Sequence, residues 1–221
     1  MLKKSFENLE RNIKLILLRY LPTIPTDLLA VIETIFNTHD GATEFDFYSD
    51  SIPSHKLIYG LAPIGVKLEK APRIPIPYPT KQGELAYIQW VMKSLASDGE
   101  AGVIVPHGFM FRDGFNKLVR NELFTDFNVH TILSLPNGFL PMAGIKSEVL
   151  FFNRQPSVGT WVWRQEPSNH DLSQFIEFMA IPHKSRHENH LPLTTYISQE
   201  SIRKYVVDNI DPKIKLLFDV Y

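Results

Sequence analysis

Three short apolar runs in the middle of the chain predict strands of one sheet. They cover residues 101–105, 130–135 and 148–152, and proline, glycine or asparagine stands near their ends. Short β-branched and aromatic runs with such boundaries are typical of buried strands. A helical pattern from about 114 to 124 joins the first two, so we expect these two strands to be parallel. The third follows a loop without a helical pattern, so we expect it to return antiparallel, inserted beside the first.

Upstream of these runs, the spacing of apolar residues predicts further helices and strands. Residues 2–20 and 25–36 carry apolar side chains at spacings of three and four, which is typical of amphipathic helices. Residues 43–48 alternate as a strand would, and residues 56–60 form another short strand candidate, expected to run parallel to the first two. A helix near residues 85–95, closed by a glycine, should lead into the central strands.

Two segments are predicted to lack regular structure. Four prolines within residues 72–79 exclude a helix or a central strand, so this segment should be extended and form a rigid loop over a site. Residues 167–195 are polar and rich in histidine, which favours a solvated loop. His183, His187 and His190 lie in it, but carboxylates do not stand at ligand spacing beside them. We therefore predict no metal site.

Composition narrows the class of protein without indicating a reaction. With 221 residues, 44% of them hydrophobic, the chain suits one α/β domain, alone or with a tail. A formal net charge of −1 argues against a broad basic surface, and so against strong DNA binding by the isolated chain. The absence of cysteine excludes disulfides and thiolate zinc sites. No apolar run approaches the ~20 residues that span a bilayer, so we expect no signal peptide, no membrane anchor and a cytoplasmic location.

The central segments also resemble a known family. Residues 104–112, 129–139 and 144–152 read IVPHGFMFR, VHTILSLPNGF and GIKSEVLFF. In this order they resemble adenine-N6 DNA methyltransferases, in particular the modification subunits of type I restriction systems. The resemblance covers roughly residues 25–155 and part of the tail. It implies an incomplete Rossmann-like methyltransferase fold, with a mostly parallel sheet, one antiparallel strand and helices on both faces.

The resemblance implies a division of the chain and a helix near its end. Residues 1–155 would form a partial methyltransferase-like α/β domain that begins with the N-terminal helix. Residues 156–221 would form a C-terminal extension packed on it. Within this extension, the segment that begins at Tyr196 resembles a family segment in which Ser198 caps a short helix.

The family transfers a methyl group from S-adenosylmethionine to the exocyclic nitrogen of an adenine that is flipped out of the duplex. Asn or Asp, two prolines, and Tyr or Phe hold the base at the end of a strand. In this chain Leu61, Ala62, Pro63 and Ile64 occupy that position, and only Pro63 matches. Leu61 cannot accept a hydrogen bond from an amino group, and Ile64 cannot stack as an aromatic ring does. We therefore expect the chain to be catalytically inactive by itself.

The cofactor residues of the family are also mostly missing. The family holds S-adenosylmethionine with a glycine-rich loop after its first strand and an acidic residue after its second. No glycine precedes Gly41 in this chain, so the loop has no counterpart. Asp50 matches the acidic residue that contacts the adenine of the cofactor. Cofactor binding is therefore expected to be weak or absent.

The loops after the central strands are the expected contacts with DNA or substrate. The resemblance assigns this role to His107, Phe109, Arg112 and Lys146. It implies DNA as a partner, with a specificity subunit or an intact modification subunit as protein partner. Three functions stay open: a working methyltransferase, a degenerate or partial modification subunit, and a small α/β enzyme of unrelated chemistry that uses the loop after Pro106. We favour the second. The DNA target, and whether the chain is an intact gene product or a fragment, also stay open.

Overall fold

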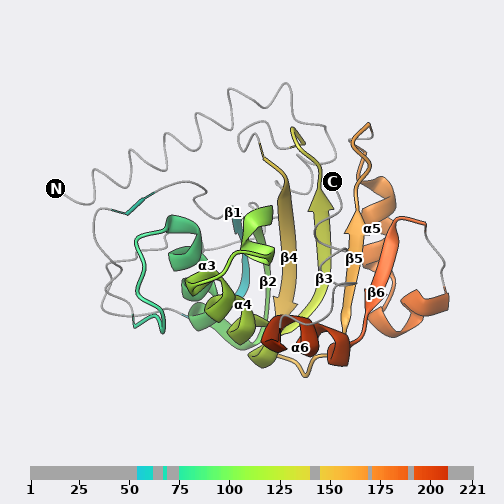
Figure 1. The fold of residues 1–221 in the computed structure, drawn as a ribbon. Helices are drawn as coiled ribbons and strands as arrows, with labels where there is room; N and C mark the ends of the chain where they lie inside the picture. The colour runs from blue at the N-terminus through green and yellow to red at the C-terminus, as the bar shows by residue number, and fades with distance from the viewer. Residues whose placement is uncertain are drawn as a thin grey trace.

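The computed structural model describes residues 54–61, 67–68, 75–139, 145–168, 171–188 and 192–208. Within these ranges, strands form one sheet in the order β1-β2-β4-β3-β5-β6 (Figure 1). The strands are β1 (His55–Leu61), β2 (Leu95–Pro106), β3 (Asn128–Leu135), β4 (Ser147–Asn153), β5 (Thr160–Arg164) and β6 (Thr194–Ile197). The helices are α3 (Gly83–Ser94), α4 (Phe115–Asp126), α5 (Ser173–Ala180) and α6 (Gln199–Asp208), with the 3₁₀ turns η2 (His107–Met110) and η3 (His183–Glu188).

The strands predicted at residues 56–60, 101–105, 130–135 and 148–152 are present, with the predicted directions. β1 pairs with β2 in parallel, and Leu61 lies opposite Ile104. β4 lies between β2 and β3 and is antiparallel to both, so β2 and β3 run in the same direction. The α/β fold and the insertion of an antiparallel strand beside β2 are therefore confirmed.

The sheet is less parallel than expected. β5 is parallel to β3, but β6 is antiparallel to β5, so β4 and β6 both oppose the other described strands. The expectation of one antiparallel strand was wrong for this reason. The direction of β6 brings the chain to Ser198 at the end of the sheet where β5 begins. From there α6 packs Ile202 into the core on the face of α3 and α4.

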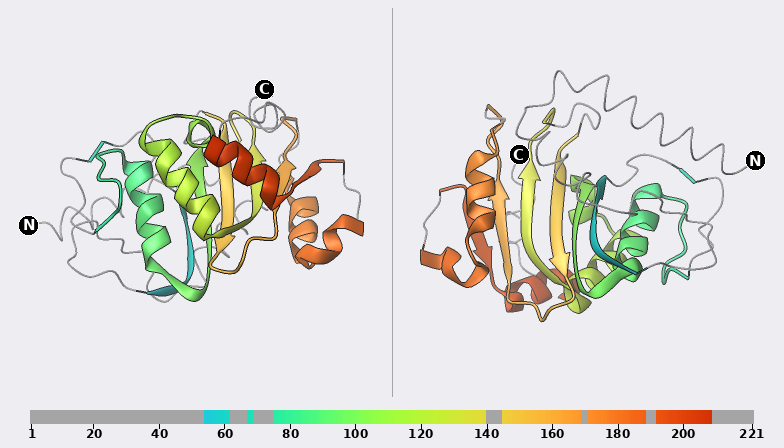
Figure 2. Two further views of the ribbon diagram at one scale, coloured as in Figure 1. Left: turned by 60° about the horizontal axis from the view of Figure 1, so that its bottom comes forward. Right: turned by 180° about the vertical axis from the view of Figure 1, so that it is seen from behind.

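Helices lie on both faces of the sheet, as predicted. α3, α4 and α6 lie on one face and α5 on the other (Figure 2). Side chains of a strand point alternately to the two faces, which divides the core into two clusters. On β4, Leu150 and Phe152 belong to the cluster under α3 and α4. Val149 and Phe151 belong to the cluster under α5.

The segment at residues 167–195 is not the solvated loop that its composition predicted. It contains α5 and η3, and Phe175 and Phe178 of α5 are buried against Trp163. The helix is short and polar residues flank it, so the three-residue spacing of its two phenylalanines was too weak a signal. The sheet supplies the aromatic surface that stabilises this helix.

Three further boundaries follow from local chemistry. α6 begins where predicted, because the Ser201 backbone N–H donates to the Ser198 hydroxyl oxygen at 3.2 Å, as an N-cap requires. Residues 75–80 form neither helix nor strand, and the Gln89 side chain accepts a hydrogen bond from Tyr78 N at 2.9 Å. The expected glycine closure of α3 was wrong: this helix ends at Ser94 and β2 starts at Leu95.

The predicted elements at residues 2–20, 25–36 and 43–48 lie outside the described residues. Among the helices that are described, none is long and apolar enough to cross a membrane.

Candidate functional site

The carboxyl ends of three parallel strands meet at one edge of the sheet. β1 ends at Leu61, β2 at Pro106 and β3 at Leu135, and β4 begins there with Ser147 (Figure 1). We call this end of the sheet the carboxyl edge. In α/β sheets, ligands bind in loops that follow the carboxyl ends of the strands.

The segment predicted to be a degenerate base-binding motif begins at this edge. Leu61 is the last residue of β1, and its backbone pairs with Ile104 of β2. Ala62, Pro63 and Ile64 lie outside the described residues, and so does Asp50. The structure therefore places Leu61 at the carboxyl edge, and the role of residues 61–64 stays a prediction.

His107 is held in place at the carboxyl edge by a buried carboxylate. Its ring atom Nδ1 is 2.7 Å from Oε1 of Glu148, which is only 1% exposed. The Ser134 hydroxyl donates to the same oxygen at 3.1 Å. The backbone N–H of His107 donates to the carbonyl oxygen of Lys146 at 3.0 Å. These contacts join the loop after β2 to the loop before β4.

Strand register explains why these side chains meet. Glu148 lies opposite Val105 on β2 and opposite Ser134 on β3, and Ser134 lies opposite Arg164 on β5. Burial lowers the pKa of the Arg164 guanidinium, and attraction to the Glu148 carboxylate partly opposes this shift. Within the part of the chain that the structure describes, Oε2 of Glu148 has no hydrogen-bond partner. Glu148 was not among the residues predicted to form a site, although a glutamate inside an apolar run was a usable signal.

The other loop residues predicted to face DNA or substrate have different positions. Phe109 is 1% exposed and its side chain packs in the core, so it anchors the loop to the core and does not face solvent. Arg112 is exposed, and its Nε is 2.7 Å from where a Cβ on Gly108 would lie, so its side chain lies along that glycine. The buried Arg120 donates to the carbonyl oxygens of Phe109 at 2.7 Å and Arg112 at 3.1 Å, which fixes the loop.

This geometry favours binding over nucleophilic catalysis. An ionised carboxylate only accepts hydrogen bonds, so the hydrogen in the His107–Glu148 contact belongs to Nδ1 of His107. The Ser134 hydroxyl donates to Glu148 and not to His107, so these three residues do not form a nucleophile–base pair. The loop after β2 instead places two basic residues, His107 and the exposed Arg112, at this edge, which suits an anionic ligand.

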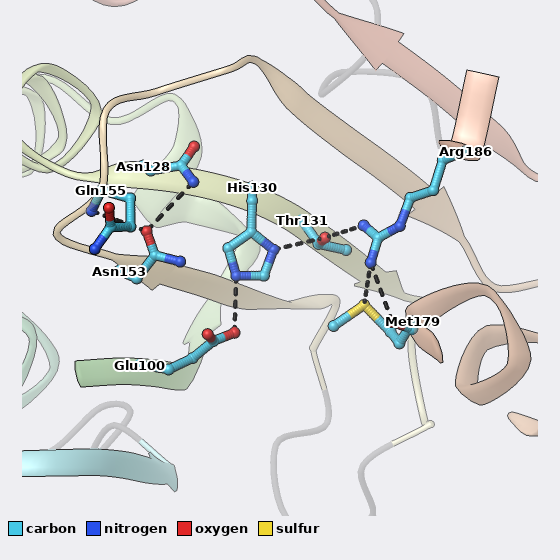
Figure 3. A network of polar contacts seen from close by, with 8 residues as sticks. All are labelled: Glu100, Asn128, His130, Thr131, Asn153, Gln155, Met179 and Arg186. Carbon is cyan, nitrogen blue, oxygen red and sulfur yellow. Dashed lines mark hydrogen bonds and ion pairs between the residues drawn. The ribbon is translucent and has the colours of Figure 1, made fainter. Parts of the chain in front are cut away.

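A second polar network lies at the opposite end of the strands (Figure 3). Nε2 of His130 is 2.9 Å from Oε1 of Glu100, and Nδ1 of His130 is 3.0 Å from the Thr131 hydroxyl oxygen. Arg186 of η3 donates to the same hydroxyl oxygen at 2.9 Å. The hydrogen bond to His130 is the main cause that lowers the pKa of Glu100, against the effect of burial. This network fastens η3 to the sheet, and the sequence analysis did not predict it.

Among the described residues, no group of three or more His, Cys, Asp or Glu side chains could hold a metal ion. His183 and His187 each contact the aromatic rings of Trp161 and Tyr196. His190 lies outside the described residues.

The described residues do not fit S-adenosylmethionine. A cofactor site of the expected kind needs a glycine-rich turn after a strand, so that the backbone can approach the ligand. In the described ranges, β2 is followed by His-Gly-Phe-Met and β3 by Pro-Asn-Gly-Phe, each with one glycine. No step of a reaction is therefore assigned to the cofactor in this part of the chain.

Comparison with known proteins identifies the family. The N-6 DNA methylase family model matches residues 65–209, which is more than half of the chain. The methylase subunit of the type I restriction enzyme EcoEI from Escherichia coli is 35% identical over 91 residues, which cover 40% of this chain and 19% of that subunit. The EcoKI methylase subunit of E. coli strain K12 is 35% identical over 77 residues, which cover 35% of this chain and 15% of that subunit. The chain thus spans less than a fifth of the length of these relatives.

Solved structures agree on the fold. A chain from a structure of the assembly of a type I R-M system superposes with a TM-score of 0.61 at 21% identity, covering 71% of this chain and 37% of that one. The methyltransferase subunit of a type I restriction-modification system from Streptococcus thermophilus superposes with a TM-score of 0.57 at 16% identity. The superposition covers 75% of this chain and 38% of that one. The family model, which matches more than half of the chain, shows that the chain belongs to the N-6 DNA methylase family.

Proposed function

We propose that the chain is a partial modification subunit of a type I restriction-modification system that does not methylate adenine by itself. One observation carries this proposal: β1 ends at Leu61, at the carboxyl edge, where the family places the side chain that accepts a hydrogen bond from the adenine amino group. A leucine side chain has no atom that can do so. The family membership of the chain supports the rest of the proposal.

The chemistry explains why the substitution matters. Methyl transfer to an exocyclic nitrogen depends on orienting that nitrogen toward the methyl donor, which is positioning more than acid–base catalysis. Leu61 removes the acceptor and Ile64 removes the stacking ring. Contacts of this kind are each worth ~1–3 kcal/mol, and every 1.36 kcal/mol is about tenfold in rate. The two losses together would lower the rate by orders of magnitude even with cofactor bound.

The proposed partners follow from the relatives. The similar proteins are methylase subunits of type I restriction enzymes, and their lengths far exceed the segment that this chain matches. We propose that the chain binds DNA weakly and associates in the cytoplasm with a specificity subunit or an intact modification subunit. The division into residues 1–155 and 156–221 also stays a proposal, with the C-terminal part extending the same sheet through β5 and β6.

The test is incorporation of labelled methyl groups into duplex DNA. The chain alone should give no incorporation above background. The variant with Leu61→Asn, Ala62→Pro and Ile64→Phe should also give none, because the cofactor residues are still missing. An intact type I modification subunit serves as the positive control, and each chain is also assayed mixed with it. Turnover by the wild-type chain alone would refute the proposal.

A small α/β enzyme that uses the loop after Pro106 is a second candidate. The observation in its favour is the His107–Glu148 contact, because a histidine held by a carboxylate can act as a general base. It ranks second because Ser134 contacts the carboxylate and not the imidazole. A chain that binds no DNA, yet turns over a small substrate in a His107-dependent manner, would favour it.

A further inference from the structure

The buried Glu148 has a role that core packing does not explain. A buried carboxylate destabilises the fold unless charged or hydrogen-bonding partners compensate its lost hydration. Glu148 lies in β4 opposite Val105 and Ser134, where a valine or leucine would pack without that penalty. Its Oε1 accepts hydrogen bonds from His107 and from Ser134. The contact that leads out of the core is the one to His107.

This contact fixes the orientation of the His107 imidazole. Nδ1 faces inward to Glu148, and the ring of Phe111 packs edge-on at 5.3 Å between centroids. The backbone of His107 is tied to Lys146 through its N–H. With Nδ1 occupied, Nε2 is the ring nitrogen that remains for a ligand.

Arg112 supplies a second donor in the same loop, four residues after Gly108. Its guanidinium lies along Gly108, the residue that follows His107. Within the described residues, no hydrogen bond or ion pair of this guanidinium is found. A ring that donates from both nitrogens is an imidazolium, and the Glu148 carboxylate balances its charge from inside. Imidazolium and guanidinium together match the oxygens of a phosphate.

We propose that Glu148 is a positioning residue, which holds His107 so that Nε2 of His107 and the guanidinium of Arg112 bind one phosphate of a DNA strand at the carboxyl edge. This inference rests on the proposed function, because it names the chemical group that the loop contacts on DNA. It also assigns a purpose to the one buried carboxylate of β4.

The orientation of His107 is tested first by long-range ¹H–¹⁵N NMR of the full chain. With a 12-base-pair duplex added, both ring nitrogens of His107 should carry a proton, and the Nε2 signal should shift with saturation. Inorganic phosphate should shift the same signal more weakly. In the Glu148→Gln variant the duplex should no longer shift it. A His107 ring protonated only at Nε2, or unmoved by both probes, would overturn the inference.

The second readout is duplex affinity at several salt concentrations. Glu148→Gln and His107→Gln should each weaken duplex binding about fivefold to tenfold. Each should also make the fall of the log association constant with log salt concentration shallower by about one. Lys93→Gln removes an exposed positive charge from the end of α3, at the opposite edge, and should leave affinity within twofold. Thermal unfolding of each variant verifies that it is folded.

These outcomes separate the inference from the proposed function. If folded Glu148→Gln and His107→Gln proteins bind the duplex as tightly as wild type, the inference fails whatever the methylation assay gives. If the wild-type chain methylates DNA, the proposed function fails while the affinity data still decide the role of Glu148. A wild-type chain that binds no duplex at low salt also overturns the inference.

Discussion

At the scale of single residues, burial sets the chemistry of His183. Its ring lies against Trp161 and Tyr196, and its Nε2 is buried without a hydrogen bond to any described residue. Burial is the main cause that lowers its pKa to about 4, and the positive charge of Arg186 adds to the shift. Composition alone indicated a solvated histidine in a polar loop. The packing of η3 on β5 changed that environment.

The lowered pKa predicts a pH dependence of stability. Between the ordinary value of 6.5 and about 4, the unfolded chain binds a proton at His183 and the folded chain does not. The contribution of His183 is therefore fully present above pH 6.5 and is lost as the pH falls toward 4. Because the ring is partly exposed, we discount the full effect and expect the free energy of unfolding to fall by about 1–2 kcal/mol over this pH range. Urea unfolding at pH 4.5 and pH 7 should show a smaller difference for His183→Gln than for wild type.

Lys184→Gln, an exposed neighbouring substitution, controls for the change of side chain itself. Equal pH dependence in wild type and His183→Gln would show that the imidazole is hydrated and titrates near its ordinary value.

At the scale of elements, the pairing of β5 with β6 depends on one glycine. Gly159 precedes β5 with φ of +98°, a region where side chains are strained. A Cβ at this position would collide with the Tyr196 hydroxyl and lie 2.9 Å from the Ile197 carbonyl oxygen. That hydroxyl donates to the Val158 carbonyl oxygen at 2.6 Å, so it is not free to move away. The turn before β5 therefore admits only glycine.

We expect Gly159→Ala to lower the free energy of unfolding by about 3 kcal/mol, from backbone strain and overpacking together. Gly138→Ala is the matched control, because Gly138 also has positive φ, at +76°, but a Cβ there meets nothing within 4 Å. Backbone strain alone should lower stability by about 1 kcal/mol in that variant. Urea denaturation of both proteins measures the difference. An equal loss of unfolding free energy in the two variants would mean that the Tyr196 side chain moves away from the new Cβ without an energetic cost.

At the scale of the whole molecule, the carboxyl edge of the sheet suits anionic ligands. Among the described residues, no glycine-rich turn that could hold the cofactor lies at this edge. His107 and Arg112 lie at this edge, although the chain as a whole has a net charge of −1. Local charge at the edge, and not the overall charge, therefore decides what the loop after β2 attracts.

We expect S-adenosylmethionine to bind the chain weakly or not at all, because the family's glycine-rich loop and the acidic residue after its second strand have no counterpart in the sequence. Calorimetric titration of the purified chain measures this, with an intact type I modification subunit titrated alongside as a control. A micromolar dissociation constant for the chain by itself would contradict the prediction and reopen the assignment of Asp50.

The sequence by itself determined the strands β1 to β4, their directions and the N-cap at Ser198. These features depend on local spacing of apolar residues and on residues at element boundaries, which can be recognised over a few positions. The same local information located Leu61 at the end of a strand. It did not separate Phe109, which packs inward, from Arg112, which is exposed, because both stand in one short loop.

Only the tertiary structure decided which distant residues meet. His107 and Glu148 are 41 positions apart, and His130 and Glu100 are 30 apart, so strand register alone brings each pair into contact. The burial of α5 and the antiparallel direction of β6 also depend on surfaces supplied by other elements. Register and burial are properties of the assembled sheet, and no local pattern in the sequence specifies them.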